Sequence, residues 1–183
     1  MTHNHSHSKT EHSHSAEEHK HESPRTLSIS LFTVSSSRFR DPKLKDDSGE
    51  IAEELSRKAG HTCSIEVIDD DKSMIRLSLM KAIVEKKSDA VVFLGGTGLS
   101  PRDVTIEAVS PLLEKQLDGF GEIFRRLSFD SIGTPALMTR ALAGTVDKKV
   151  VICLPGSPDA ARTGMGLILK ELPHAVFIAS SKP

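Results

Sequence analysis

A turn rich in glycine, Gly-Gly-Thr-Gly at 95–98, directly follows the apolar run Ala90–Leu94. Glycine has no Cβ, so the backbone can turn tightly there and bring bare N–H groups close to an anion. A helix predicted to begin near Asp103 would add the positive end of its dipole. The chain has no GxxxxGK[ST] motif, which excludes a P-loop. It also has no GxGxxG after its first strand, which argues against a dinucleotide-binding Rossmann site. The turn favours a phosphate site of another kind, although glycines can also serve only to make a turn.

A second turn repeats this pattern after the apolar run Lys149–Leu154. Pro155, Gly156 and Ser157 follow it and precede a predicted helix. The Ser157 hydroxyl can cap that helix, or it can hold a phosphate together with neighbouring N–H groups. Two such turns at one edge of a sheet indicate a phosphorylated ligand more strongly than either turn alone.

Acidic residues also cluster where predicted elements end or begin. Asp69–Asp71 follows the strand predicted at Thr62–Ile68, and Asp46–Asp47 opens a helix. Aspartate before a helix most often caps its N-terminus. Carboxylates beside a phosphate loop are also what a Mg²⁺–nucleotide site requires. Both interpretations stay open at this point.

Apolar periodicity predicts the elements that must position these loops. The sequence predicts alternating strands and helices, which imply a three-layer α/β/α sandwich with a mainly parallel central sheet. Ligands of such sheets bind at the carboxyl ends of the strands, where both glycine turns would lie. The predicted strands are Leu27–Val34, Thr62–Ile68, Ala90–Leu94, Lys149–Leu154 and a short His174–Ala179; the predicted helices are Ser48–Ala59, Ser73–Lys86, Asp103–Leu117 and Ser157–Leu172.

The first 26 residues differ from the rest in composition. Seven of the nine histidines lie there, and Met1 and Ala16 are its apolar residues. We expect residues 1–26 to form a disordered His-rich tail and residues 27–183 to form a single domain. The repeated His-x-His pattern has the imidazoles to bind Zn²⁺, Ni²⁺ or Cu²⁺, which leaves open a metal-handling role.

Composition argues against several classes of function. The chain has 24 basic and 25 acidic residues, so its net charge is −1, and it contains neither Trp nor Tyr. This balance gives no electrostatic footprint for nucleic acid. No apolar run approaches the roughly 20 residues of a membrane span, and the N-terminus lacks the apolar segment of a signal peptide, so we expect a cytoplasmic protein.

Cys63 and Cys153 sit in apolar contexts and are expected to be buried thiols.

Three segments, in this order, resemble one known family. GGTGLSPRDVT, FRRLSFDSIGTPALMTRALAG and LPGSP resemble the MoaB/MogA family of molybdenum cofactor biosynthesis, which is related to the gephyrin G domain. The resemblance covers Ser28 to about Leu172. It implies an α/β/α sandwich that assembles into trimers or hexamers. It also implies Mg²⁺-dependent adenylylation of molybdopterin by ATP, with a product used by a downstream molybdate- or tungstate-inserting enzyme.

Site residues follow from this resemblance position by position. It implies Asp70 and Asp103 as the catalytic aspartates and as ligands of nucleotide-bound Mg²⁺. The implied nucleotide-binding residues are Gly95, Gly96, Thr97, Gly98, Gly156 and Ser157, and the implied pterin-binding residues are Asp47, Ser48, Gly49, Thr139 and Arg140. The chain departs from the family pattern at three positions: Ser36 stands where Asp is frequent, Asp69 where Pro is, and Thr139 where Ser is.

Three functions are compatible with these residues. The first is a molybdopterin adenylyltransferase, and the second is a catalytically silent carrier of molybdopterin or its nucleotide form. The third is a metal-handling protein that uses the His-rich tail. The presence of both Asp70 and Asp103 favours the enzyme over the carrier. The metal-handling function would leave both glycine turns unexplained.

Overall fold

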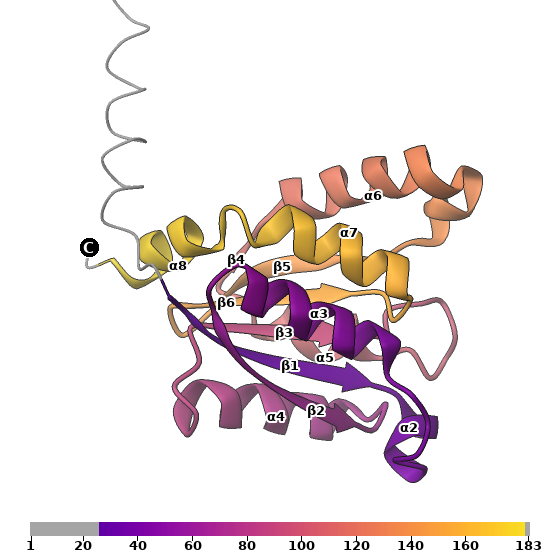
Figure 1. Ribbon diagram of the computed structural model, residues 1–183, viewed down its shortest axis with the longest axis horizontal. Coiled ribbons are helices and arrows are strands. Elements are labelled where there is room, and N and C mark those ends of the chain that lie inside the picture. The colour runs from indigo at the N-terminus through magenta and orange to yellow at the C-terminus, as the bar shows by residue number, and fades with distance from the viewer. Residues whose placement is uncertain (1–25, 182–183) are drawn as a thin grey trace, which may run out of the picture.

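A six-stranded sheet in the order β2-β1-β3-β6-β5-β4 forms the middle layer of the molecule. The computed structural model describes residues 26–181 and places helices on both faces of this sheet (Figure 1). Strands β2, β1, β3 and β6 are parallel, whereas β5 and β4 run antiparallel to their neighbours. The strands are β1 (Ser28–Val34), β2 (Thr62–Ile68), β3 (Ala90–Leu94), β4 (Lys115–Gln116), β5 (Leu142–Val146) and β6 (Lys149–Leu154). The expected α/β/α sandwich with a mainly parallel sheet is confirmed.

Seven α-helices and two 3₁₀ turns connect the strands within residues 26–181. The helices are α2 (Ser36–Arg40), α3 (Asp47–Lys58), α4 (Lys72–Val84), α5 (Thr105–Val109), α6 (Asp118–Ile132), α7 (Pro158–Ile168) and α8 (Leu172–Ser180), and the 3₁₀ turns are η1 (Ser110–Leu112) and η2 (Thr134–Met138). In this part of the chain, no helix has the length and apolar character needed to cross a membrane.

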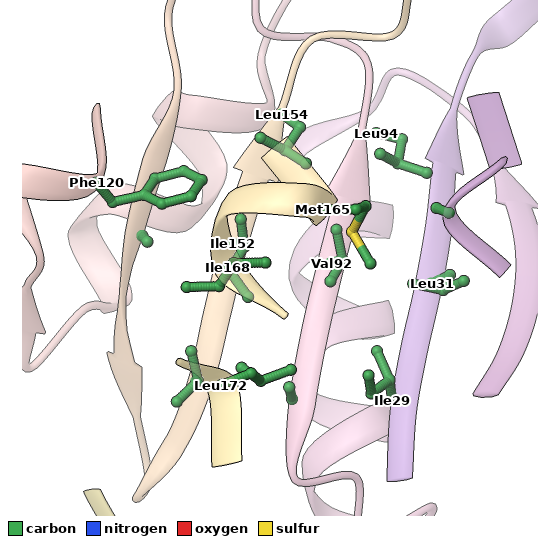
Figure 2. Packing of buried hydrophobic residues seen from close by; sticks show 14 of the residues in the cluster. Ile29, Leu31, Val92, Leu94, Phe120, Ile152, Leu154, Met165, Ile168 and Leu172 are labelled. Carbon is green, nitrogen blue, oxygen red and sulfur yellow. The ribbon is translucent and has the colours of Figure 1, made fainter. Parts of the chain in front are cut away.

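The core is divided by the sheet into two apolar clusters, because successive side chains of a strand point to opposite faces. On one face, Val92 and Ile152 pack beneath Met165 and Ile168 of α7 (Figure 2). Helices α3, α6 and α8 also contribute to this cluster. On the other face, neighbouring strand residues pack against α4 and α5. The central strands β3 and β6 are buried on both faces, so packing on each side positions their carboxyl ends.

Two predicted elements are wrong. His174–Ala179 belongs to helix α8 rather than to a strand, and Pro173 occupies the first turn of that helix. The single helix predicted over Asp103–Leu117 is instead the short α5, the turn η1 and the two-residue strand β4. Pro111 lies within η1, where the regular helix has already ended. The expected tail, residues 1–26, lies almost entirely outside the described residues.

The two cysteines differ in burial. Cys153 is fully buried in β6, and burial raises the pKa of its thiol, as expected for an inert core residue. Cys63 is half-buried, and burial also raises the pKa of its thiol despite the nearby Arg57.

Candidate functional site

A cavity of about 440 Å³ opens at the carboxyl ends of β1, β3 and β6. Strands β3 and β6 end at Leu94 and Leu154, which lie side by side in the sheet (Figure 2). The loops that follow these strands line the cavity, as the parallel order of the strands predicts. Its lining residues are Val34, Ser35, Asp70, Gly95, Gly96, Thr97, Gly98, Asp103, Pro135, Met138, Thr139, Arg140, Pro155 and Gly156.

The first glycine loop is folded in a way that needs glycine. Gly95 and Gly96 have φ angles of +106° and +62°, a region that side chains rarely adopt. A Cβ on Gly95 would lie 2.5 Å from the carbonyl oxygen of Val34, and one on Gly96 would overlap the Thr105 hydroxyl. That hydroxyl donates to the Gly95 carbonyl at 2.9 Å, and the Thr105 N–H donates to the Gly96 carbonyl at 2.8 Å. The loop is therefore tied to the start of α5.

Four consecutive N–H groups of this loop have no internal partner. Within residues 26–181, the amides of Gly96, Thr97, Gly98 and Leu99 donate no hydrogen bond, whereas the Gly95 amide donates to Leu154 at 2.9 Å. Successive N–H groups in a turn that includes the left-handed conformation form a concave site for an anion. The loop thus offers unpaired donors beside the cavity.

The second glycine loop approaches the first backbone to backbone. A Cβ on Gly156 would lie 3.1 Å from the Cα of Gly95, so a side chain there would force the two loops apart. Gly156 and Pro155 line the cavity, but Ser157 does not. Ser157 caps α7 by accepting a hydrogen bond from the Ala160 N–H at 3.2 Å.

Ser157 also lines a smaller cavity of about 120 Å³, which shares Thr139 and Pro155 with the larger one. The two cavities therefore adjoin at these shared residues.

Asp70 reaches the cavity from the loop after β2. Its Oδ2 accepts hydrogen bonds from the Ser36 N–H at 2.8 Å and from the Ser36 hydroxyl at 3.1 Å. Its Oδ1 lies against Gly96 and accepts no hydrogen bond from the described residues. The N-cap of α4 is Asp71, whose Oδ1 accepts from the Met74 N–H at 2.8 Å. Helix capping therefore does not account for Asp70.

Asp103 is held in a similar way. Its Oδ2 accepts from the Ser100 N–H at 3.0 Å, and its Oδ1 accepts no hydrogen bond in the described part of the chain. Helix α5 begins at Thr105, and within residues 26–181 no side chain caps it. Asp103 therefore shapes the turn before α5 without capping that helix. Its neighbour Arg102 is exposed and does not line the cavity.

Arg140 crosses from the link between η2 and β5 to the first glycine loop. Its Nε donates to the Thr97 carbonyl at 2.7 Å, and its Nη2 donates to the Gly98 carbonyl at 2.9 Å. The same guanidinium forms an ion pair with Glu107 of α5, with Nη1 at 2.6 Å from Oε1. Hydrogen bonding to Arg140 lowers the pKa of the Glu107 carboxyl.

The turn Asp47-Ser48-Gly49 does not line either cavity. It lies at the start of α3, where Asp46 is the N-cap and accepts from the Gly49 N–H at 3.1 Å. Ser48 is buried and donates to the same Asp46 oxygen at 3.1 Å, while Asp47 pairs with Lys45. These residues build the helix start in this structure.

Sequence reasoning missed two supporting contacts. Ser36 departs from the family pattern, and nothing in the sequence indicates its two hydrogen bonds to Asp70. Nothing in the sequence marks Glu107 as a partner of Arg140 either. These partners are separated by 34 and 33 residues along the chain, and no local pattern marks such a pair.

Known proteins that are similar to this chain share one family. A family described as "Probable molybdopterin binding domain" matches residues 30–174. A "Molybdenum cofactor biosynthesis protein B" of Bacillus anthracis is 43% identical over 158 residues, which cover 85% of this chain and 92% of that protein. A "Probable molybdopterin adenylyltransferase" of Methanocaldococcus jannaschii is 38% identical over 155 residues, covering 82% and 92%.

Solved structures show the same fold. The tungsten cofactor synthesizing protein MoaB from Pyrococcus furiosus superimposes with a TM-score of 0.79 at 36% identity, covering 86% of this chain and 99% of that one. The family match over residues 30–174 includes every residue that lines the larger cavity. The chain therefore belongs to the MoaB/MogA family of molybdenum cofactor biosynthesis proteins.

Proposed function

We propose that this protein is a molybdopterin adenylyltransferase that uses Mg–ATP and releases pyrophosphate. The observation that carries the proposal is one cavity that combines unpaired loop amides with two aspartates that do not cap helices. The cavity is lined by Gly96, Thr97 and Gly98, whose amides donate no hydrogen bond within residues 26–181, and by Asp70 and Asp103. The name of the M. jannaschii relative supports the same activity. In this reaction a phosphate oxygen of molybdopterin attacks the α-phosphorus of ATP. The bond between that phosphorus and the oxygen that bridges the α- and β-phosphates breaks, and pyrophosphate leaves.

The first glycine loop is proposed to hold the phosphates of the nucleotide. The N–H groups of Gly96 to Leu99 are free to donate, and the absence of side chains at Gly95, Gly96 and Gly98 allows close approach. Hydrogen bonds from backbone amides to charged oxygens are strong because the acceptor is ionised. The leaving pyrophosphate carries more charge than it did within ATP, so the same donors would stabilise the transition state.

Asp70 and Asp103 suit Mg²⁺ bound through a nucleotide. Each carboxylate has one oxygen anchored by protein donors and a second oxygen without a partner among residues 26–181. In the same range, no three Asp, Glu, His or Cys side chains gather into a cluster that would hold a metal alone. Proteins commonly bind Mg²⁺ through one or two carboxylates together with substrate phosphates. The ion would neutralise phosphate charge and hold the reacting oxygens in register.

The pterin is proposed to occupy the side of the cavity formed by η2 and the residues after it. Pro135, Met138 and Thr139 line this side, and they combine an apolar surface with a hydroxyl group. A flat heterocycle needs both kinds of contact. Because Arg140 is bonded to the glycine loop and to Glu107, it contributes to this side mainly by its position.

The deciding experiment is to incubate the full chain with molybdopterin, ATP and Mg²⁺ and to measure pyrophosphate release. Mass spectrometry should identify adenylyl-molybdopterin, and chelation of Mg²⁺ should abolish its formation. Binding of molybdopterin without release of pyrophosphate would overturn the proposal and identify the protein as a carrier. The adenylylated product would then be the substrate of a separate enzyme that inserts molybdate or tungstate.

A further inference from the structure

We propose that Arg140 and Glu107 act as a positioning pair that fixes the orientation of the first glycine loop, and that Arg140 is not itself a ligand of the substrate. This inference rests on the proposed function in so far as the loop is taken to bind phosphates. It assigns a task to Glu107 and gives Arg140 a different task from the pterin contact that the family resemblance implies. The pair joins three segments: the loop after β3, helix α5 and the link between η2 and β5.

The donors of Arg140 are almost fully used within the protein. A guanidinium has five N–H groups. Among residues 26–181, Arg140 makes four hydrogen bonds: to the Thr97 carbonyl, to the Gly98 carbonyl and to both carboxylate oxygens of Glu107. A substrate phosphate would have to compete with these bonds and with the charge of Glu107. The arrangement is therefore suited to holding the loop and poorly suited to binding an anion.

The two bonds to carbonyl oxygens determine where loop amides point. In a trans peptide unit, the C=O of one residue and the N–H of the next point in opposite directions. Because Arg140 holds the carbonyls of Thr97 and Gly98, the N–H groups of Gly98 and Leu99 are directed away from it. These are two of the four unpaired amides. Arg140 thus determines the orientation of half of the proposed phosphate donors.

Glu107 holds Arg140 in this orientation. Its two oxygens lie 2.6 and 3.3 Å from Nη1 and Nη2, which is the two-point contact that fixes the plane of a guanidinium. Helix α5 carries Glu107 and is itself tied to the loop through Thr105. Lysine has a single ammonium group and lacks this planar fork. Charge alone would therefore not replace Arg140.

Binding of inorganic pyrophosphate with Mg²⁺ to the full chain, measured by calorimetry, tests this inference. We expect Arg140→Met and Arg140→Lys each to weaken binding by about tenfold or more, because both lose the orientation of two donors. Glu107→Gln should also weaken binding, and Glu107→Gln combined with Arg140→Met should be no weaker than Arg140→Met alone. The control is Arg126→Met, which removes an exposed ion pair with Asp130 on α6 and should bind normally.

The lysine variant separates positioning from direct contact. If Arg140→Lys binds pyrophosphate as tightly as the unaltered chain, or if Glu107→Gln binds it more tightly, a free cation is what the ligand needs. Either result would overturn the inference. Equal losses in Arg140→Lys and Arg140→Met support it.

A second readout without ligand separates this inference from the proposed function. The amide chemical shifts of Gly96 and Gly98 in the ¹⁵N-labelled chain should move in Arg140→Met, Arg140→Lys and Glu107→Gln, but not in Arg126→Met. Unchanged shifts in the three variants would overturn the positioning role even if the chain binds pyrophosphate. If the shifts move but the unaltered chain binds neither pyrophosphate nor ATP, the pair positions the loop and the proposed function is the part that fails.

Discussion

At the residue scale, the structure shows that neither Asp70 nor Asp103 caps a helix. Asp71, the neighbour of Asp70, caps α4, and no side chain in the described part of the chain caps α5. Each of the two aspartates keeps one oxygen at the cavity that has no partner among the residues the structure describes. Their charges thus have no structural task that an uncharged amide could not perform, which makes their charge the property to test.

Replacing Asp70 or Asp103 by Asn should reduce adenylylation by a factor on the order of one hundred or more. Asn keeps an oxygen that can accept the anchoring hydrogen bonds, so the melting temperature should change little. Pyrophosphate release and thermal unfolding measure the two effects. The matched control is Asp71→Asn, which should keep both activity and stability because Asn caps a helix about as well as Asp. Normal turnover in both variants would instead show that neither carboxylate takes part in the reaction.

The ion pair between Glu107 and Arg140 should stabilise the folded protein at neutral pH and lose this effect at low pH. Its hydrogen bond to Arg140 lowers the pKa of Glu107 below the ordinary value of 4.5, so the unfolded chain takes up its proton first as the pH falls. The contribution of Glu107 to stability is therefore complete above the ordinary pKa and is lost as the pH falls through the lowered one. Urea unfolding between about pH 6 and about pH 3 should show a shallower loss for Glu107→Gln than for the unaltered chain. Identical slopes would show that the pair contributes no acid-dependent stability.

At the scale of elements, close packing of α7 on β6 depends on one glycine. A Cβ on Gly164 would overlap both methyl groups of Leu154, whereas one on Gly166 would meet open space. Gly164→Ala should destabilise the protein by about 1–3 kcal/mol, because the buried Leu154 must shift. Gly166→Ala should stabilise it by about 0.5–1 kcal/mol, because alanine favours a helix over glycine. Equal effects of the two substitutions in denaturant unfolding would contradict this packing.

The four parallel strands could be predicted from the sequence, whereas the antiparallel strands β4 and β5 and the helices α6 and α8 could not. Strands β1, β2, β3 and β6 have apolar runs bounded by turn residues, and both glycine loops follow from their position after such strands. The run within α8 is short and apolar, and periodicity alone does not distinguish a buried strand from a helix of that length. Helix α6 went unpredicted, and it carries glycines at 119 and 121.

The position of the site could be predicted from the sequence, but the orientation of its side chains could not. Residues that follow β2, β3 and β6 meet at one edge of the sheet because parallel strands end together. The sequence therefore predicts that Asp70, Gly96 and Gly156 lie close together, and all three line the cavity. The orientation of their side chains depends on partners far along the chain, such as Ser36 for Asp70. Such pairs are set by packing, which a single sequence does not reveal.

At the scale of the whole molecule, an exposed apolar surface over α6 and η2 supports the expected assembly. Ile123, Leu127 and Leu137 are 51%, 42% and 82% exposed in the single chain. Monomeric proteins rarely leave such surface uncovered when it is contiguous. We expect light scattering of the full chain to give the mass of a trimer or hexamer, and replacement of Ile123 and Leu127 by Lys to give smaller species. A monomer mass for the unaltered chain at micromolar concentration would contradict this.

Removal of residues 1–25 should leave the fold and the adenylylation unchanged. That segment contains Met1 and Ala16 as its apolar residues, so it has little surface with which to stabilise the core. Tight binding of Ni²⁺ or Zn²⁺ should disappear with it, because seven of the nine histidines are removed. Calorimetric melting and metal titration of the shortened chain test both points. A large fall in melting temperature would show that the segment is part of the folded structure.

The two ends of β1 lie at opposite edges of the sheet, which determines where the protein can be attached to a surface without blocking the cavity. Its carboxyl end at Val34 lines the cavity, whereas its start at Ser28 lies six residues away, about 20 Å along an extended strand. A protein immobilised on a sensor chip through Thr26, which is exposed just before β1, would therefore present the open cavity toward the flowing solution. Attachment through the loops after β3 or β6 would block it. Labels for surface-based binding measurements therefore belong at the start of β1, near Thr26.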